Sequence, residues 1–462
     1  MSRFVRFLLH HDLGTEARAH LSLFGGDLPD LELLTDLTHL SLDEPLPEDG
    51  PLRLSDGCLG RAGIWHAAAG GDGTGEIFFD EALAEVFAEM PPALRSDIGA
   101  KAMEAYLRQG PITAADQLFA LAARAGAQDS PDMRLVEGQL LSGDARHMEA
   151  EEIFGDVAAQ NVKAAPSALY LLIQSLNARG APVPEALLAQ AKSTAWLLRQ
   201  DLAGPPLLLE TVRADAGANN LDAALRTIAE EIRITPDRAQ MYRLVAAELV
   251  AQADPTAVSP ADYSAAVLTN LRALPEDGSG DVARRAAAAA LLDLALPDTA
   301  LAVLTPAMAR RAPDVLLLAA RAHLASGRAH VALQLAADLG SEARELRAEA
   351  LAQLGQHRAA AQLYETGAER AVPEPLALAA GNWDALTTSE DEIRRGIGEF
   401  MRADGPDAPD PSTVFGTRAP LPDRPSLEQT RLLLEQNRAT RETVEGILND
   451  VPPSLVVPER TN

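Results

Sequence analysis

The sequence predicts an all-α fold: a right-handed α-solenoid of antiparallel helix pairs, preceded by a small irregular N-terminal segment that includes candidate β-strands. Three observations predict this fold. Segments of roughly 10 to 18 residues, with apolar positions three and four apart, alternate with short breaks at Pro and Gly. Aromatic residues make up only 4% of the chain and alanine is abundant, which favours closely packed helices. Small and large residues also recur along the chain at offsets that vary between 28 and 38 residues.

The first 80 residues do not show the helical pattern. Three short apolar runs lie here among Gly and Pro residues, namely Leu52–Leu54, Ile64–Ala67 and Glu76–Phe79. Runs of this kind next to turn residues are typical of short β-strands. Residues 1–80 are therefore predicted to form an irregular segment that is separate from the helical array.

The remainder of the chain divides into three parts by composition. Residues 81–370 carry the helical pattern and are predicted to form the array. Residues 371–425 are assigned to a linker because their second half is rich in Pro and Asp. Residues 426–450 are predicted to form a terminal amphipathic helix, since Ser426 and Gln429 have the spacing of a capping box. Its apolar side is expected to dock on the array or on a partner.

The internal repeat is visible when one segment is shifted onto the next. A shift of 28 positions keeps five residue types. The matched pairs are Leu318/Leu346, Ala320/Ala348, Gly327/Gly355, Ala332/Ala360 and Leu335/Leu363. In a helix hairpin, a small residue on each helix is needed where the backbones cross, and a large residue one turn later fills the space beside it. The triplets Gly138/Ala150/Phe154 and Ala288/Ala300/Leu304 have this spacing.

These residues resemble the tetratricopeptide repeat family. The best match is Tyr106–Gly110 followed by Ala115 and Phe119, and Pro236 closes another unit. The resemblance covers about residues 95–370, although the repeat length varies and the tryptophan of the family's first helix is missing. It implies a stack of helix pairs that presents a concave surface to a protein or peptide partner and that is not itself catalytic.

The resemblance also implies which side chains would face that groove. The candidate groove residues are Asp97, Glu104 and Arg108 near the start of the array, and Asp314, Arg321, Glu345 and Glu349 near its end. Lysine and asparagine are absent from these positions, so a clamp for a C-terminal carboxylate is not expected. The acidic character of the face instead predicts a partner segment that carries Arg or Lys.

Charge and composition limit the other partners. The formal net charge is −27, which disfavours nucleic acid and anionic membranes. No apolar run approaches the roughly 20 residues that a membrane span needs. The basic start of the chain is too short for the apolar core of a signal peptide. A cytoplasmic location is expected if Met1 is the true start, and a periplasmic or exported one if a leader is missing.

Few residues suggest chemistry. Gly70–Thr74 resembles the phosphate-contacting turn of diacylglycerol and NAD kinases, but no alternating strand–helix pattern surrounds it, so a glycine turn is favoured. The single cysteine, Cys58, has only His66 nearby as a possible base, and the histidines lack metal-ligand spacing. No cofactor, metal or catalytic residue is therefore predicted. The alternatives are a structural or assembly subunit and, less favoured, an enzyme that uses the glycine turn.

Overall fold

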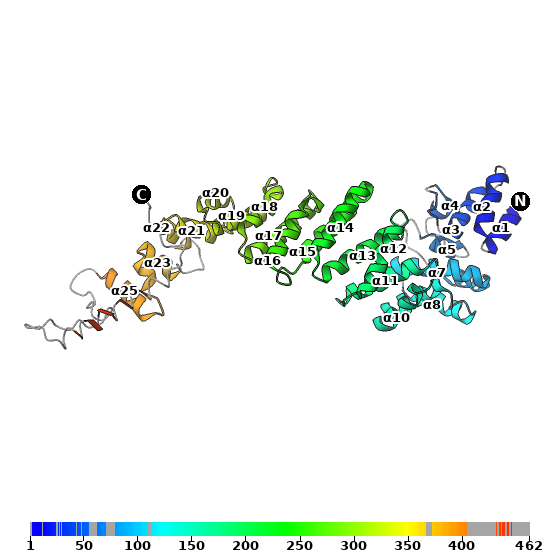
Figure 1. Ribbon diagram of the computed structural model, residues 1–462, viewed down its shortest axis with the longest axis horizontal. Helices are drawn as coiled ribbons and strands as arrows, with labels where there is room; N and C mark the ends of the chain where they lie inside the picture. The colour runs from blue at the N-terminus through cyan, green and yellow to red at the C-terminus, as the bar shows by residue number, and fades with distance from the viewer. Residues whose placement is uncertain are drawn as a thin grey trace, which may run out of the picture. The chain divides into compact units, whose positions relative to one another are not determined.

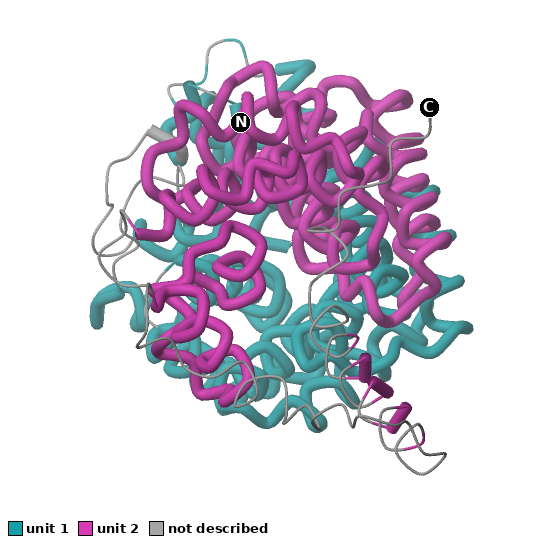
Figure 2. The backbone as a smooth tube through the Cα atoms, turned by 90° about the vertical axis from the view of Figure 1, so that its left-hand side faces the viewer, with its two compact units in different colours: residues 1–218 teal, residues 219–462 magenta. Residues whose placement is uncertain are grey.

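The structure is a computed structural model, and most of residues 2–403 are described. The described residues are 2–11, 13–24, 26, 28, 30–42, 44–47, 49–54, 62–70, 79–109, 112–365, 372–403, 431, 434–435, 437–438, 441–442 and 445. None of these residues forms a β-strand, which confirms the predicted all-α class. The chain divides into two compact units, residues 1–218 and residues 219–462 (Figure 2).

The described part of the first unit consists mainly of helices (Figure 1). Its helices are α1 (Ser2–His10), α2 (Gly14–Phe24), α3 (Leu31–Ser41), α4 (Pro51–Leu54), α5 (Gly63–Ala68), α6 (Glu81–Glu89), α7 (Pro92–Gln109), α8 (Ile112–Arg124), α9 (Pro131–Gly143), α10 (His147–Ala158), α11 (Ala165–Ala178), α12 (Glu185–Leu197) and α13 (Gly204–Gly217). From α7 onward, helices pack in chain order: α7 contacts α8 and α9, and α11 contacts α10 and α13. This is the arrangement expected of stacked helix pairs.

Two of the three predicted strands are helices, so that prediction was wrong. Leu52–Leu54 lies in α4 and Ile64–Ala67 lies in α5. Ile64 and Ala67 are three residues apart, which places both on one helical face, and both are fully buried in the core that α5 shares with α7. A short apolar run fits a strand or a buried helix equally well, and packing decides between them. Of the third run, only Phe79 is described, and it lies outside any helix.

The second unit repeats the pattern of stacked helices. Its helices are α14 (Leu221–Ile234), α15 (Ala239–Gln252), α16 (Pro260–Thr269), α17 (Gly278–Asp293), α18 (Pro297–Met308), α19 (Pro313–Ala325), α20 (Ala329–Ala336), α21 (Arg344–Gln353), α22 (His357–Glu365), α23 (Glu374–Ala380), α24 (Trp383–Leu386) and α25 (Glu392–Arg402), with the 3₁₀ turns η3 (Pro236–Arg238) and η4 (Leu271–Ala273). Each helix from α17 to α22 packs on the next, and α15, α17, α19 and α21 also meet in sequence. Of these four, α17, α19 and α21 are the first helices of the pairs α17/α18, α19/α20 and α21/α22.

The predicted helix crossings are closely packed in both units. Ala288 of α17 and Ala300 of α18 have no exposed surface, and neither has Leu304 one turn later. Gly138 of α9 faces Phe154 of α10 so closely that an added Cβ would lie 2.4 Å from the ring atom Cε1. The small residues therefore stand where the repeat predicts them, because larger side chains would hold the two helices apart.

The turns inside the helix pairs share one backbone conformation. Gly327 and Gly355, which the repeat aligns, have φ angles of 73° and 75°. Ala145 and Ala295 occupy the corresponding turns after α9 and α17, with φ angles of 62° and 57°. A left-handed conformation costs an alanine about 1 kcal/mol that a glycine does not incur. The turns therefore keep their shape even where the sequence does not supply the favoured residue.

Replacing Ala295 by glycine is expected to raise the free energy of unfolding by up to about 1 kcal/mol. The gain comes from relief of the left-handed strain, reduced by the greater freedom of glycine in the unfolded chain. Urea unfolding followed by circular dichroism measures it. The matched control is Ala302→Gly in the middle of α18, which is expected to lower the stability because glycine weakens a helix interior. If both changes lower the midpoint equally, the turn is not strained.

The first part of the predicted linker is helical instead. Residues 374–402 form α23, α24 and α25. The Asp391 side chain accepts hydrogen bonds from two backbone N–H groups at the start of α25, and Leu386 of α24 is fully buried. Gly398 of α25 lets that helix approach Leu386, because an added Cβ would lie 2.9 Å from the leucine Cβ. The Pro and Asp composition that suggested a linker belongs to residues 404–425, which lie outside the described residues.

The predicted terminal helix lies mostly outside the described residues. Those of its residues that are described, between 431 and 445, are helical and exposed. Arg438 pairs with Glu442 at 3.4 Å and Arg441 pairs with Glu445 at 2.8 Å, each four residues apart. Exposed pairs of this kind add only a few tenths of a kcal/mol to a helix. The proposed docking of its apolar side stays a prediction.

Candidate functional site

A stripe of charged side chains runs along α7 in the first unit. Asp97, Lys101, Glu104 and Arg108 are spaced by four, three and four residues, which places them on one helical face. Lys101 Nζ lies 2.9 Å from Asp97 Oδ1 and donates a hydrogen bond of 2.7 Å to the Leu40 carbonyl oxygen. Asp97 is half-buried and its carboxylate is paired with Lys101, whereas Arg108 is exposed. Sequence reasoning did not include Lys101 in this stripe.

The carboxyl groups beside this stripe are harder to ionise than usual. Burial raises the pKa of Glu104, and the neighbouring charge of Asp132 on α9 raises it further, while Arg108 and Lys101 act in the opposite direction. Burial also raises the pKa of Asp132, again opposed by Lys101. The carboxyl groups of Glu104 and Asp132 thus lie close enough to influence each other, and the cations of Lys101 and Arg108 partly offset the rise in their pKa values. A cationic group of a partner would favour ionisation of both carboxyl groups.

A second set of charged side chains lies on the first helices α17, α19 and α21. Asp314 at the start of α19 pairs with Arg285 of α17, and Arg321 lies two turns further along α19. Arg321 is exposed and has no ion pair or hydrogen bond to any described residue. Glu345 and Glu349 lie one turn apart on α21, and both are exposed. The structure thus joins Asp314 to a residue that the sequence did not single out.

Glu349 of α21 also affects the pKa of a tyrosine on the next helix. Tyr364 of α22 is half-buried, and its pKa is raised mainly by burial and additionally by the negative charge of Glu349. A basic group placed next to Glu349 would cancel that second contribution. These helices therefore carry the cation of Arg321, which has no ion pair with a described residue, and the exposed carboxylates of Glu345 and Glu349.

Sequence reasoning missed a polar row between α11 and α13. Asn177 donates hydrogen bonds of 2.9 Å to both the backbone oxygen and the Oε2 of Glu210, and Arg213 donates to Glu210 Oε1 at 2.8 Å. Gln174, which lies on the same face of α11 as Asn177, donates a hydrogen bond of 2.8 Å to the Tyr170 hydroxyl. These side chains satisfy one another, so the asparagine is already engaged. The only available signal was the spacing of Tyr170, Gln174 and Asn177 on one helical face.

The sequence candidates for chemistry fall mostly outside the described residues. Cys58 and residues 71–74 of the glycine run are not described, and Gly70 has a φ angle of 84°, as a glycine turn requires. Within the described ranges, no group of three or more His, Cys, Asp or Glu side chains is placed to hold a metal ion. Among the same residues, none of the helices combines the length and the apolar character that crossing a bilayer demands.

Comparison with known proteins adds no relative. No family model, no curated protein and no solved structure matches the chain. The function has to be argued from the helical array and from the side chains that its faces carry.

Proposed function

We propose that this chain is a protein-binding scaffold of the tetratricopeptide repeat type, which holds an extended segment of a protein partner across the first helices of its pairs. The observation that carries the proposal is the set of charged side chains on three successive first helices, namely Arg285, Asp314, Arg321, Glu345 and Glu349, of which Arg285 and Asp314 form an ion pair. Stacked helix pairs offer such faces as long, shallow surfaces on which a peptide contacts one pair after another.

The partner segment is proposed to carry Arg or Lys. Glu345 and Glu349 are exposed on one face of α21. A guanidinium or ammonium group of the partner would meet these exposed carboxylates directly. An acidic chain with a net charge of −27 would in addition attract a basic segment from a distance.

Binding of a basic peptide to the second unit tests the proposal. Fluorescence anisotropy of a labelled peptide of alternating Arg and Leu, titrated with the full chain, is expected to saturate, whereas the peptide with Gln in place of Arg is not. The double variant Glu345→Gln/Glu349→Gln is expected to weaken binding about ten-fold, since each exposed ion pair contributes up to about 1 kcal/mol. Raising the salt concentration should weaken binding in the same way.

A charge-matched control separates this face from the general acidity of the chain. The double variant Glu230→Gln/Asp338→Asn removes the same charge from exposed positions on α14 and after α20. It is expected to bind the Arg peptide as tightly as the unchanged chain. Equal weakening by both double variants would mean that the peptide senses only net charge, and the proposed groove would then be wrong.

A further inference from the structure

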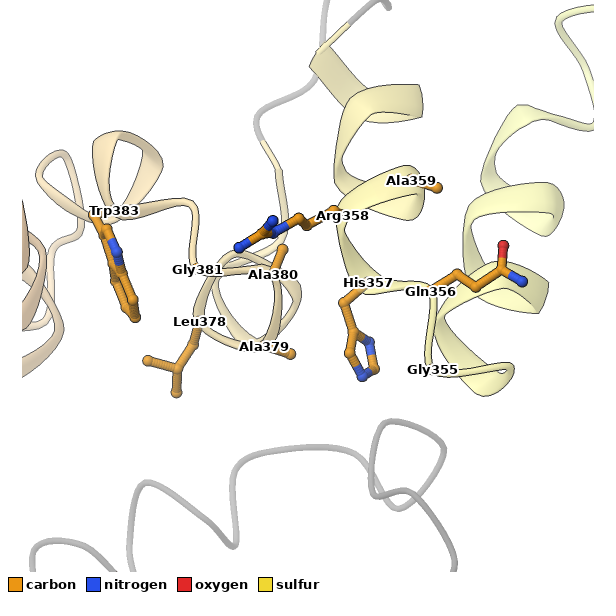
Figure 3. A pocket seen from close by; sticks show the side chains of 10 residues that line it. All are labelled: Gly355, Gln356, His357, Arg358, Ala359, Leu378, Ala379, Ala380, Gly381 and Trp383. Atoms are coloured by element: carbon orange, nitrogen blue, oxygen red, sulfur yellow. The ribbon is translucent and has the colours of Figure 1, made fainter.

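A hollow of about 700 Å³ lies in the second unit, between the turn that precedes α22 and the helices α23 and α24. Its lining combines charged, aromatic and aliphatic side chains. The residues that line it are Gly355, Gln356, His357, Arg358, Ala359, Leu378, Ala379, Ala380, Gly381 and Trp383. In Figure 3, the side chains of His357, Leu378 and Trp383 project to the same side, while Arg358 reaches from α22 toward Ala380 and Gly381.

The carboxylates of α22, α23 and α24 are already engaged. The only acidic residue of α22, Glu365, accepts a hydrogen bond of 2.6 Å from Asn382. The only one of α23, Glu374, pairs with Arg394 at 2.6 Å, and the only one of α24, Asp384, pairs with Arg402 at 2.8 Å. The three helices therefore offer no unengaged carboxylate to Arg358.

In contrast to these carboxylates, the cation that lines the hollow has no partner among the described residues. Arg358 is exposed and makes no hydrogen bond or ion pair with any described residue. The hollow therefore presents a cation that has no partner among the described residues.

The apolar wall of the hollow is formed by Trp383 and Leu378. Gly381 has a φ angle of 68°, and an added Cβ there would contact the indole at 3.5 Å, so the absence of a side chain leaves that edge of the ring uncovered. An uncovered indole packs well against proline or aliphatic side chains. The hollow therefore presents an apolar surface next to a cation that has no partner.

We propose that this hollow binds an extended acidic peptide segment of a protein partner, in which Asp or Glu alternates with Pro or Leu. The carboxylate meets the Arg358 guanidinium, and the apolar residue lies against Trp383. The site is distinct from the face on α17, α19 and α21, which is proposed to take a basic segment. The same scaffold would then hold two segments of opposite charge.

Titration of a labelled peptide of alternating Asp, Pro and Leu with the full chain tests this inference. Anisotropy is expected to saturate, and the quantum yield of Trp383 is expected to change in a Trp65→Phe/Trp196→Phe background, where it is the only remaining tryptophan. Arg358→Gln is expected to weaken binding about ten-fold, the usual effect of losing a charge-assisted hydrogen bond. The same peptide with Asn in place of Asp is expected to bind the unchanged chain no more tightly than the Asp peptide binds Arg358→Gln.

Two controls make the result decisive. Arg272→Gln removes another exposed arginine of the second unit and is expected to leave binding unchanged. Glu345→Gln/Glu349→Gln is also expected to leave it unchanged, which separates this site from the groove. The inference is overturned if no saturable binding occurs at millimolar peptide, if the Asn peptide binds as tightly, or if Arg358→Gln and Arg272→Gln behave alike. Loss of basic-peptide binding alone would count against the groove and not against the hollow.

Discussion

Replacing Arg284 by methionine is expected to lower the free energy of unfolding by about 3 kcal/mol, the usual cost of removing one partner from a buried ionic group. Arg284 of α17 is 2% exposed, and its Nη1 atom donates a hydrogen bond of 2.7 Å to the Pro275 carbonyl oxygen. The same atom lies 3.8 Å from Asp281. Methionine fills a similar volume, but it leaves that carbonyl oxygen without a donor.

The surrounding network explains why nothing else replaces the lost donor. Arg310 pairs with Asp281 through a two-pronged contact, and its Nη1 donates to the Glu276 carbonyl oxygen at 2.6 Å. Its nitrogen atoms are therefore committed to other oxygens. Gly280 lies so close to Pro275 that an added Cβ would be 1.9 Å from the carbonyl oxygen, so the loop before α17 has no room to shift.

Urea unfolding of the full chain, followed by circular dichroism, measures this loss as a lower midpoint for the second unit. Arg272→Met serves as the control, because Arg272 is exposed and a surface substitution of this kind usually changes stability by less than about 0.5 kcal/mol. Similar midpoints for Arg284→Met and Arg272→Met would show that the buried network does not stabilise the start of α17.

The helical array could be predicted because its constraints are local and repeated. Ala288 and Ala300 sit at a crossing that admits only small side chains, and the same requirement recurs in each pair. Gly327 and Gly355 mark the same left-handed turn in two neighbouring pairs. Such positions are read from a single sequence because both the spacing and the residue size are fixed by the geometry of a helix hairpin.

The two ends of the chain were harder to predict because short segments carry no period. α5 is only six residues long, too short for a 3.6-residue repeat to differ clearly from an alternating one, and its helical form depends on burial against α7. α23 and α24 are also short. Composition averaged over residues 371–425 was dominated by the Pro and Asp residues that follow Arg402, and this hid the helices before them.

The candidate sites were only partly predictable because their residues are distant in the sequence. Helical spacing placed Asp314 and Arg321 on one face, but the pairing of Asp314 with Arg285 depends on how α17 and α19 stack. The contact of Lys101 with the Leu40 carbonyl oxygen spans 61 residues. The hollow beside Trp383 could not be anticipated, since it needs both the turn before α22 and helices that were assigned to a linker.

Replacing Gly138 by leucine is expected to lower the free energy of unfolding of the first unit by about 3 kcal/mol, through overpacking of a helix crossing. Gly138 is buried, and even a single added carbon would lie 2.4 Å from Phe154 Cε1, closer than real side-chain carbons approach. Leucine adds three more carbons, so α9 and α10 must separate or the phenylalanine ring must leave its site. The expected readout is a lower melting temperature in differential scanning calorimetry.

Gly155 of α10 provides the matched control, because an added Cβ there meets no atom within 4 Å. Gly155→Leu is expected to keep or slightly raise the melting temperature, since leucine favours a helix more than glycine does. Removing the Phe154 ring tests its contact with position 138 directly. The double variant Gly138→Leu/Phe154→Ala is expected to lose clearly less stability than the two single variants added together, because the new side chain occupies the space that the ring leaves. Strict additivity would mean that Gly138 and Phe154 do not share that space, and the predicted crossing would be misplaced.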